Sequence, residues 1–157
     1  MILDVCCGSK MFYFDKQDAN VLFCDNRILD TNLCDGRELK IRPQIVCDFK
    51  KLPFKNDSFD SVIFDPPHLS KLGESSWMAK KYGKLGINWE SDLKAGFDEC
   101  MRVLKSGHTM VFKWNCTQHP ASKLIEIFGK NPILGHKSGK ASKTHWMLFY
   151  KEKNDDI

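Results

Sequence analysis

Several features that would place this chain in a familiar class are missing from its 157 residues. No stretch approaches the run of about 18 apolar residues that a membrane-spanning helix requires, so no membrane partner is expected. The N-terminus enters an apolar segment directly, without the basic region and long apolar core of a secretory signal. We therefore expect a cytoplasmic protein.

The seven cysteines form no CxxC pair, so the usual spacing of a zinc site is absent and no metal site is predicted. Their number is odd, and Cys6 and Cys7 are adjacent. Several others lie inside apolar segments that are predicted to be strands. This distribution favours reduced, buried thiols, as in cytosolic proteins.

Two phosphate-binding motifs are also missing, because the chain has neither GxxxxGK[ST] nor a complete GxGxxG. The net charge of +4 is mildly basic, which permits an anionic partner without requiring one. With 42% hydrophobic and 28% charged residues, the composition is that of an ordinary globular protein. The length suits one domain, residues 1–157, with one core.

Apolar segments alternate with segments of helical character along the chain. This alternation predicts an α/β fold with a doubly wound, mostly parallel sheet. A long stretch between the fourth strand and the next helix, residues 69–88, lacks periodicity and is expected to form a loop or lid. The predicted strands are residues 1–7, 20–25, 43–49, 59–65, 108–115 and 144–151, and the predicted helices are 8–17 (after a turn), 89–105 and 120–130.

Acidic residues stand at the ends of four successive predicted strands: Asp4, Asp25, Asp48 and Asp65. In a sheet of this kind the carboxyl ends of the strands meet at one edge, where ligands bind. Like charges repel one another, so four acids gathered at that edge indicate that something is bound there.

The spacing of these acids indicates an adenosine ligand. Gly8 lets the chain approach a ligand closely, and Asp25, about 20 residues later, can take both ribose hydroxyls. Asp48 can meet an adenine amino group while Phe49 stacks on the ring. The alternatives are that Asp25 caps a turn and that Asp48 is a turn acid followed by a core phenylalanine. An adenosine without pyrophosphate points to S-adenosyl-L-methionine (SAM), whose cationic groups give Asp4 a partner.

The segments ILDVCCGS, FCDN, CDF and FDPPH resemble, in order, the motifs of class I SAM-dependent methyltransferases. The segment RVLKSGH is similar to a turn common before the fifth strand of that superfamily. The resemblance covers nearly the whole chain and implies the Rossmann-like sheet of that class. It also implies a set of SAM-binding residues: Asp4, Cys6, Gly8, Ser9, Asp25, Asp48, Phe49 and Asp65.

Within that superfamily, Asp65-Pro66-Pro67-His68 resembles the [DNS]PP[YFW] motif of the amino-methyltransferases. These enzymes methylate exocyclic nitrogens, mainly N6 of adenine or N4 of cytosine in DNA and RNA, and one branch acts on glutamine amides. The resemblance implies that these four residues are catalytic. His68 stands where Tyr, Phe or Trp is usual.

The residue types suit this chemistry. The lone pair of an exocyclic amine is delocalised into the ring, which makes the nitrogen a poor nucleophile. The Asp65 carboxylate and the Pro66 carbonyl can accept its two N–H groups and aim the lone pair at a methyl group. Proline also fixes φ and removes an N–H donor, and His68 can stack on the target base. Lys113 and Trp114, at the end of the fifth predicted strand, are further candidates for facing the site.

Lysines gather in two predicted loops, with aromatic residues between those of the first loop. This combination favours DNA or RNA as the partner, and the alternative is a solvated surface. Two other functions stay open: a methyltransferase for a protein amide or a small-molecule amine, and a SAM-binding module without catalysis. The two groups are Lys71, Lys80, Lys81 and Lys84 within residues 71–84, and Lys137, Lys140 and Lys143 within residues 137–143.

Overall fold

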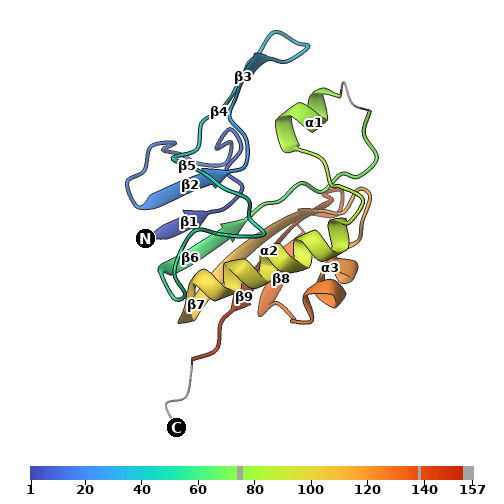
Figure 1. Cartoon of the computed structure of the whole chain (residues 1–157). Helices are drawn as coiled ribbons and strands as arrows, with labels where there is room; N and C mark the ends of the chain where they lie inside the picture. Colours follow the sequence, from blue (N-terminus) through green and yellow to red (C-terminus); the bar gives the residue numbers. More distant parts are fainter. Residues whose placement is uncertain (74–75, 138, 154–157) are drawn as a thin grey trace.

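A seven-stranded, mostly parallel sheet forms the centre of the molecule in a computed structural model that describes residues 1–73, 76–137 and 139–153 (Figure 1). The strand order is β5-β2-β1-β6-β7-β9-β8, and β9 runs antiparallel to both of its neighbours. The predicted α/β fold with a Rossmann-like sheet is confirmed. The strands are β1 (Ile2–Asp4), β2 (Val21–Asp25), β5 (Ile45–Val46), β6 (Phe59–Phe64), β7 (Leu104–Asn115), β8 (Leu134–Lys137) and β9 (Thr144–Tyr150).

The order of the strands fixes where a ligand can bind. The chain builds outward from β1 to β2 and β5, then crosses back to add β6 on the other side of β1. The direction of winding therefore reverses between β1 and β6. A crevice opens at such a reversal, at the carboxyl ends of the strands.

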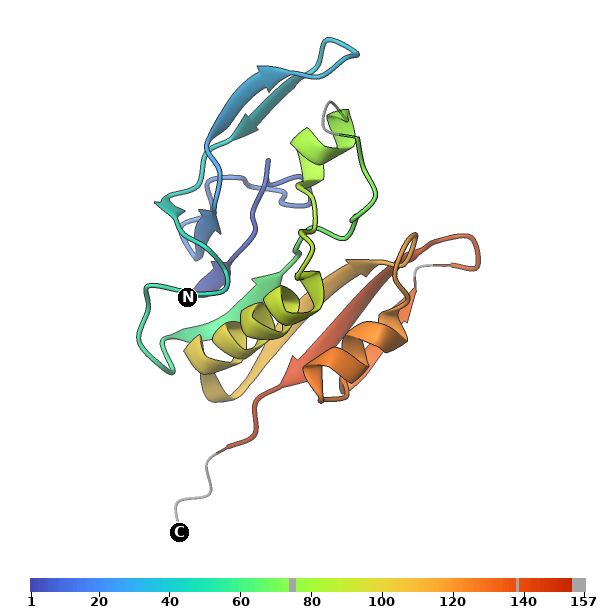
Figure 2. The ribbon, with the colours of Figure 1, turned by 45° about the vertical axis from the view of Figure 1, so that its right-hand side comes forward.

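Two helices, α2 (Trp89–Val103) and α3 (Ala121–Phe128), cover the same face of the sheet (Figures 1 and 2). The apolar side of α2 is buried there, and Phe97 stacks on Phe128 with ring centroids 4.2 Å apart. Gly129 ends α3 in the left-handed conformation, as glycine commonly does. Both helices lie within the predicted ranges.

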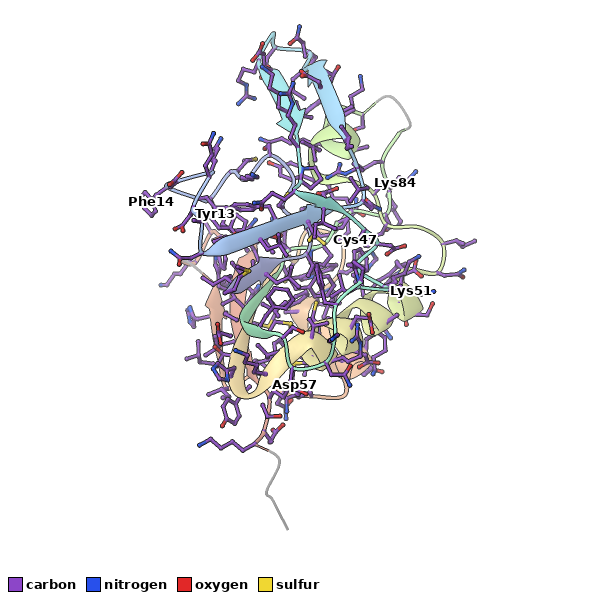
Figure 3. All side chains as sticks on the ribbon, turned by 60° about the vertical axis from the view of Figure 1, so that its left-hand side comes forward. Tyr13, Phe14, Cys47, Lys51, Asp57 and Lys84 are labelled. Atoms are coloured by element: carbon purple, nitrogen blue, oxygen red, sulfur yellow. The ribbon has the colours of Figure 1, made fainter. Side chains whose placement is uncertain are left out.

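The helix predicted within residues 8–17 is wrong, because this segment forms turns. Gly8 and Lys10 both have positive φ, of 50° and 57°, which a right-handed helix does not accept. The segment is anchored through Tyr13, whose ring packs edge-on against Phe23 of β2. Phe14 points away from the molecule (Figure 3) and is fully exposed.

Two further elements project beyond the carboxyl edge of the sheet (Figure 2). One is an unpredicted hairpin of β3 (Leu29–Asn32) and β4 (Glu38–Ile41), which buries a small apolar cluster of its own. The other is α1 (Trp77–Tyr82), a short helix inside the predicted loop 69–88, which begins after Ser76 and ends at Gly83. The short strand β8 was also not predicted.

The cysteines in the structure are free thiols, of which Cys7, Cys24 and Cys100 are buried and Cys34 is exposed. Among the described residues, no helix is both long and apolar enough to span a bilayer. The same part of the chain holds no cluster of three or more side chains suited to binding a metal ion.

Candidate active site

A cavity of about 220 Å³ opens at the carboxyl ends of β1, β2 and β6, where the winding reverses. Five separate segments of the chain, together with α1 and the residues that follow it, contribute to its wall. The cavity therefore brings together most of the predicted site residues. These are Cys6, Gly8, Ser9, Asp25, Phe49, Asp65, Pro66, Pro67 and His68, whereas Asp4 and Asp48 are not part of its lining.

Asp25 closes the turn that follows β1. The backbone N–H of Gly8 donates to its Oδ2 at 2.9 Å, and the backbone N–H and Nε of Arg27 donate to its Oδ1 at 3.0 and 3.1 Å. The carboxylate is 3% exposed. These hydrogen bonds agree with the alternative interpretation, a turn cap, and because Asp25 also lines the cavity, its contact with a ribose stays a prediction.

Arg27 was not predicted, although it lines the cavity and contacts the acid beside it. Its Nη1 also donates to the carbonyl of Lys80 in α1 at 3.1 Å. One guanidinium therefore joins the acid at the end of β2 to the helix over the mouth. The only sequence signal for this link is the two-residue spacing from Asp25.

Asp4 lies behind the cavity wall and is fully buried. Its Oδ1 accepts from the backbone N–H of Cys6 at 3.1 Å, and its Oδ2 accepts from the Tyr13 hydroxyl at 2.8 Å. Burial raises the pKa of Asp4 to about 7, and these two hydrogen bonds oppose the shift. Asp4 thus ties the turn after β1 to the segment that carries Tyr13, and its contact with a cofactor stays a prediction.

Phe49 forms an apolar part of the wall, but Asp48 beside it points outward. The Asp48 carboxylate accepts from the backbone N–H of Lys50 at 2.9 Å and lies 3.7 Å from the ammonium of that residue. Phe49 packs edge-on against Phe64 and over Gly96 of α2. The role of Asp48 with adenine stays a prediction.

Gly96 determines how closely Phe49 approaches α2. A Cβ at this position would lie 2.4 Å from Cδ2 of Phe49 and 2.8 Å from Cζ of Phe64. Gly96→Ala gains about 1 kcal/mol of helix propensity but costs about 1–3 kcal/mol through overpacking. We expect the free energy of unfolding, measured with denaturant, to fall by up to about 2 kcal/mol.

Asp98→Ala, on the exposed side of the same helix, serves as the control for Gly96→Ala. If Gly96→Ala instead raises the free energy of unfolding by about 1 kcal/mol, only the gain in helix propensity is present. Phe49 would then move aside without cost, and the overpacking argument would be wrong.

Asp65 follows β6 directly and forms an ion pair with Lys113 of β7, whose Nζ donates to Oδ2 at 2.8 Å. Burial raises the pKa of Asp65, and the charge and hydrogen bond of Lys113 oppose that rise. The Lys113 ammonium also lies over the rings of Phe12 and Trp146, at 5.2 and 5.6 Å from their centroids. Lys113 therefore faces the site, as predicted.

His68 lies at the end of the same loop, with ring centroids 5.8 Å from Tyr82 and 6.2 Å from Trp114. Burial and the nearby charge of Lys113 lower the pKa of His68, which favours a neutral ring at neutral pH. A neutral ring can stack on another ring without the free-energy cost of removing water from a charge. Trp114 itself is buried in the core beneath His68 and lines neither cavity, so the prediction that it faces the site is wrong.

A second cavity, of about 230 Å³, adjoins the first. The two cavities share the Asp65–Lys113 ion pair together with His68 and Tyr82. These four side chains therefore form a partition that a reacting group in either cavity can touch.

No protein-family model matches the chain, and no curated protein matches it. Solved structures do resemble it. A protein from Pyrococcus horikoshii aligns over 96% of this chain and 81% of its own, with 14% identity and a TM-score of 0.61. A SAM-dependent methyltransferase from Methanosarcina mazei aligns over 98% and 92%, with 11% identity and a TM-score of 0.59. A TehB-like SAM-dependent methyltransferase from Corynebacterium glutamicum aligns over 96% and 79%, with 16% identity and a TM-score of 0.59.

The chain has the fold of the class I methyltransferases. At such low identity the likeness establishes the fold alone, so the chemistry has to come from this chain's own residues. The class I fold places the glycine turn after β1, the acid after β2 and the Asp-Pro-Pro loop after β6 around one cavity.

Proposed function

We propose that this chain is a SAM-dependent methyltransferase that modifies an exocyclic amino nitrogen, of the N6-adenine or N4-cytosine type, in DNA or RNA. The observation that carries the proposal is the position of Asp65-Pro66-Pro67-His68. This loop lies in the wall of a cavity that also contains a glycine turn and a ribose-type acid, and two of its residues border a second cavity.

The first cavity suits the adenosine part of SAM. Gly8, in the turn after β1, has no side chain. The space where a Cβ would stand is open, with no atom within 4 Å, so a ligand can approach the backbone there. Asp25 offers a carboxylate for ribose hydroxyls, in competition with Arg27. Phe49 supplies a flat apolar wall for adenine. Asp4 lies behind the wall. When its carboxyl group is ionised, its negative potential favours the cationic sulfonium and amino groups of SAM.

When bound, SAM supplies an electrophilic methyl group, so the amine nitrogen forms a bond to carbon as the carbon–sulfur bond breaks, and a proton then leaves the nitrogen. Within the described chain only Lys113 donates to Asp65, and it does so at Oδ2. Oδ1 is therefore available to accept an N–H of the amine. The raised pKa of Asp65 also suits it to take the departing proton.

The lysines of the two predicted basic loops support a polyanionic partner. Among the described residues, none of the seven has a carboxylate within 4.0 Å, whereas the charged side chains of the β3–β4 hairpin pair with one another. Lys81 and Lys84 line the mouth of the first cavity. Lys81 also lies over the Tyr82 ring at 5.0 Å, so charge and stacking surface coincide there.

Nucleoside mass spectrometry tests the proposal. The purified protein is incubated with SAM carrying a deuterated methyl group and with separate pools of DNA and RNA, which are then digested. Labelled N6-methyladenine or N4-methylcytosine is expected in one pool, and binding to that pool should weaken steeply as salt rises. If SAM binds but neither pool is labelled, a protein amide or small-molecule amine becomes the acceptor. If Asp65→Ala changes no activity at all, the chain is a binding module.

Asp25→Asn is expected to weaken SAM binding by about tenfold to a hundredfold, because a charged partner of the ribose hydroxyls is lost. Calorimetric titration of the purified variant measures the affinity. Asp30→Asn in the β3–β4 hairpin is the control, since Asp30 is exposed, pairs with Arg42 and lies outside both cavities. If Asp25→Asn leaves the affinity for SAM unchanged, Asp25 does not bind the ribose.

A further inference from the structure

The second cavity has two chemically different ends. Its sides are apolar and aromatic, formed by Leu69, Met78 and the rings of His68 and Tyr82. At one end Lys113 pairs with Asp65, and at the other, two residues further along β7, Asn115 is hydrogen-bonded to Thr117 and Thr144. Flat apolar sides with polar groups at both ends suit a flat heteroaromatic ring that carries hydrogen-bonding groups along one edge.

The hydrogen bonds at the second end fix which groups remain available. Asn115 Oδ1 accepts from both the backbone N–H and the hydroxyl of Thr117, at 2.9 and 2.5 Å. A backbone N–H can only donate, so the oxygen of the amide must point to Thr117. The amide nitrogen therefore points to Thr144, whose hydroxyl it reaches at 3.3 Å.

This orientation leaves donors facing the cavity. The Asn115 amide nitrogen has a second N–H beyond the one given to Thr144. The Thr144 hydroxyl accepts from Asn115 and keeps its own proton to donate. The end near Asp65, in contrast, offers the carboxylate Oδ1 as an acceptor. Along one line the cavity thus presents the Asp65 acceptor, with the Lys113 ammonium beside it, followed by donors.

The strand geometry gives these groups a suitable separation. Lys113 and Asn115 are two residues apart on β7, so their side chains point to the same face about 6.6 Å apart along the strand. Thr144 is the direct partner of Asn115 on β9. This separation is comparable to the spacing of the hydrogen-bonding groups along one edge of a pyrimidine, with the hydrogen bonds running side by side from that edge.

We propose that the second cavity holds the acceptor base and that its Asn115–Thr144 end selects cytosine over adenine. Cytosine presents an amine, a ring nitrogen acceptor and a carbonyl acceptor in sequence, which complements one acceptor and two donors. Adenine presents an amine and one ring nitrogen acceptor, followed by a C–H that meets the remaining donor unpaired. This inference rests on the proposed function and narrows it to N4-cytosine.

Two kinds of single-stranded oligonucleotide, each made both as DNA and as RNA, test the selection. One contains only cytosine and thymine, the other only adenine and thymine, with uracil in place of thymine in the RNA. With deuterated-methyl SAM, the wild-type protein is expected to label the cytosine oligonucleotide in preference to the adenine one. Thr144→Val removes one donor while keeping a β-branched side chain, and Asn115→Asp replaces the donating amide with an acceptor. Each is expected to raise KM for the cytosine oligonucleotide by about threefold to tenfold, with SAM affinity unchanged.

Thr109→Val is the matched control, because Thr109 lies on the same strand outside both cavities and should leave KM unchanged. Preferred labelling of adenine overturns the cytosine assignment and leaves the proposed function intact. An active protein whose KM is unchanged in both variants overturns the role of the Asn115–Thr144 end. Label in none of these oligonucleotides, DNA or RNA, with SAM bound, overturns the proposed function and this inference with it. Unchanged SAM affinity shows that each variant is folded.

Discussion

Asp65→Ala is expected to lower kcat by about a hundredfold to ten-thousandfold, the range that one proton-transfer group supplies. The same change should alter SAM affinity little. Asp65 is the only carboxylate in the partition between the two cavities, and within the described chain its sole partner is Lys113. Without Asp65, the amine lacks the hydrogen-bond acceptor that orients its lone pair, and the proton that leaves the nitrogen lacks an acceptor. Single-turnover kinetics with the labelled polymer measures the chemical step.

Two control variants separate the charge of Asp65 from its shape. Asp65→Asn keeps an oxygen that accepts a hydrogen bond but carries no charge, so its kcat is expected to lie between those of Asp65→Ala and the wild type. Asp60→Ala, at the opposite end of β6, removes a surface partner of Lys105 and should leave kcat unchanged. Loss of SAM binding in Asp65→Ala would make this residue a cofactor contact and not the acceptor's partner.

The sequence signals that succeed are local. Strand β6 ends in an apolar run that is followed by an acid and two prolines, so its end and the position of Asp65 can be predicted from the sequence. Helix α2 is predicted by apolar residues at helical spacing. The place of Asp25 follows because β2 is a plain apolar run that ends in an acid. Each of these features depends on residues that are neighbours in the chain.

The features that escape prediction depend on residues far apart in sequence. Lys113 meets Asp65 because β6 and β7 are adjacent in register, a pairing that spans 48 residues. Gly96 matters because of Phe49, and a helix pattern shows only that a small residue sits there. Arg27 reaches α1 across 53 residues. The position of Asp4 behind the wall likewise follows from Tyr13, which a predicted helix would have placed elsewhere.

Lys113→Met is expected to move the acid limb of the kcat–pH profile to higher pH. Burial raises the pKa of Asp65 and Lys113 opposes that rise, so removing the ammonium leaves burial unopposed and raises the pKa of Asp65 further. Only the ionised carboxylate can accept the amine's N–H or its proton, so the variant loses activity at a pH where the wild type retains it. A charge-assisted hydrogen bond contributes about 1.5–3 kcal/mol, which corresponds to a loss of about tenfold to a hundredfold at the acid end.

The shift in the profile, and not the loss alone, distinguishes this role from packing. At high pH Asp65 is ionised with or without Lys113, so kcat of Lys113→Met should approach that of the wild type there. Lys113→Arg keeps a cation beside Asp65 and should restore the wild-type limb, whereas Lys105→Met, which removes the partner of exposed Asp60, should not move it. Burial raises the pKa of Asp4 to about 7 and the charge of Asp65 adds to that rise, so a shift of the limb that persists in an Asp4→Asn background belongs to Asp65. A uniform loss across the whole pH range would mean that Lys113 acts through its contacts with Phe12 and Trp146 and not through the charge of Asp65.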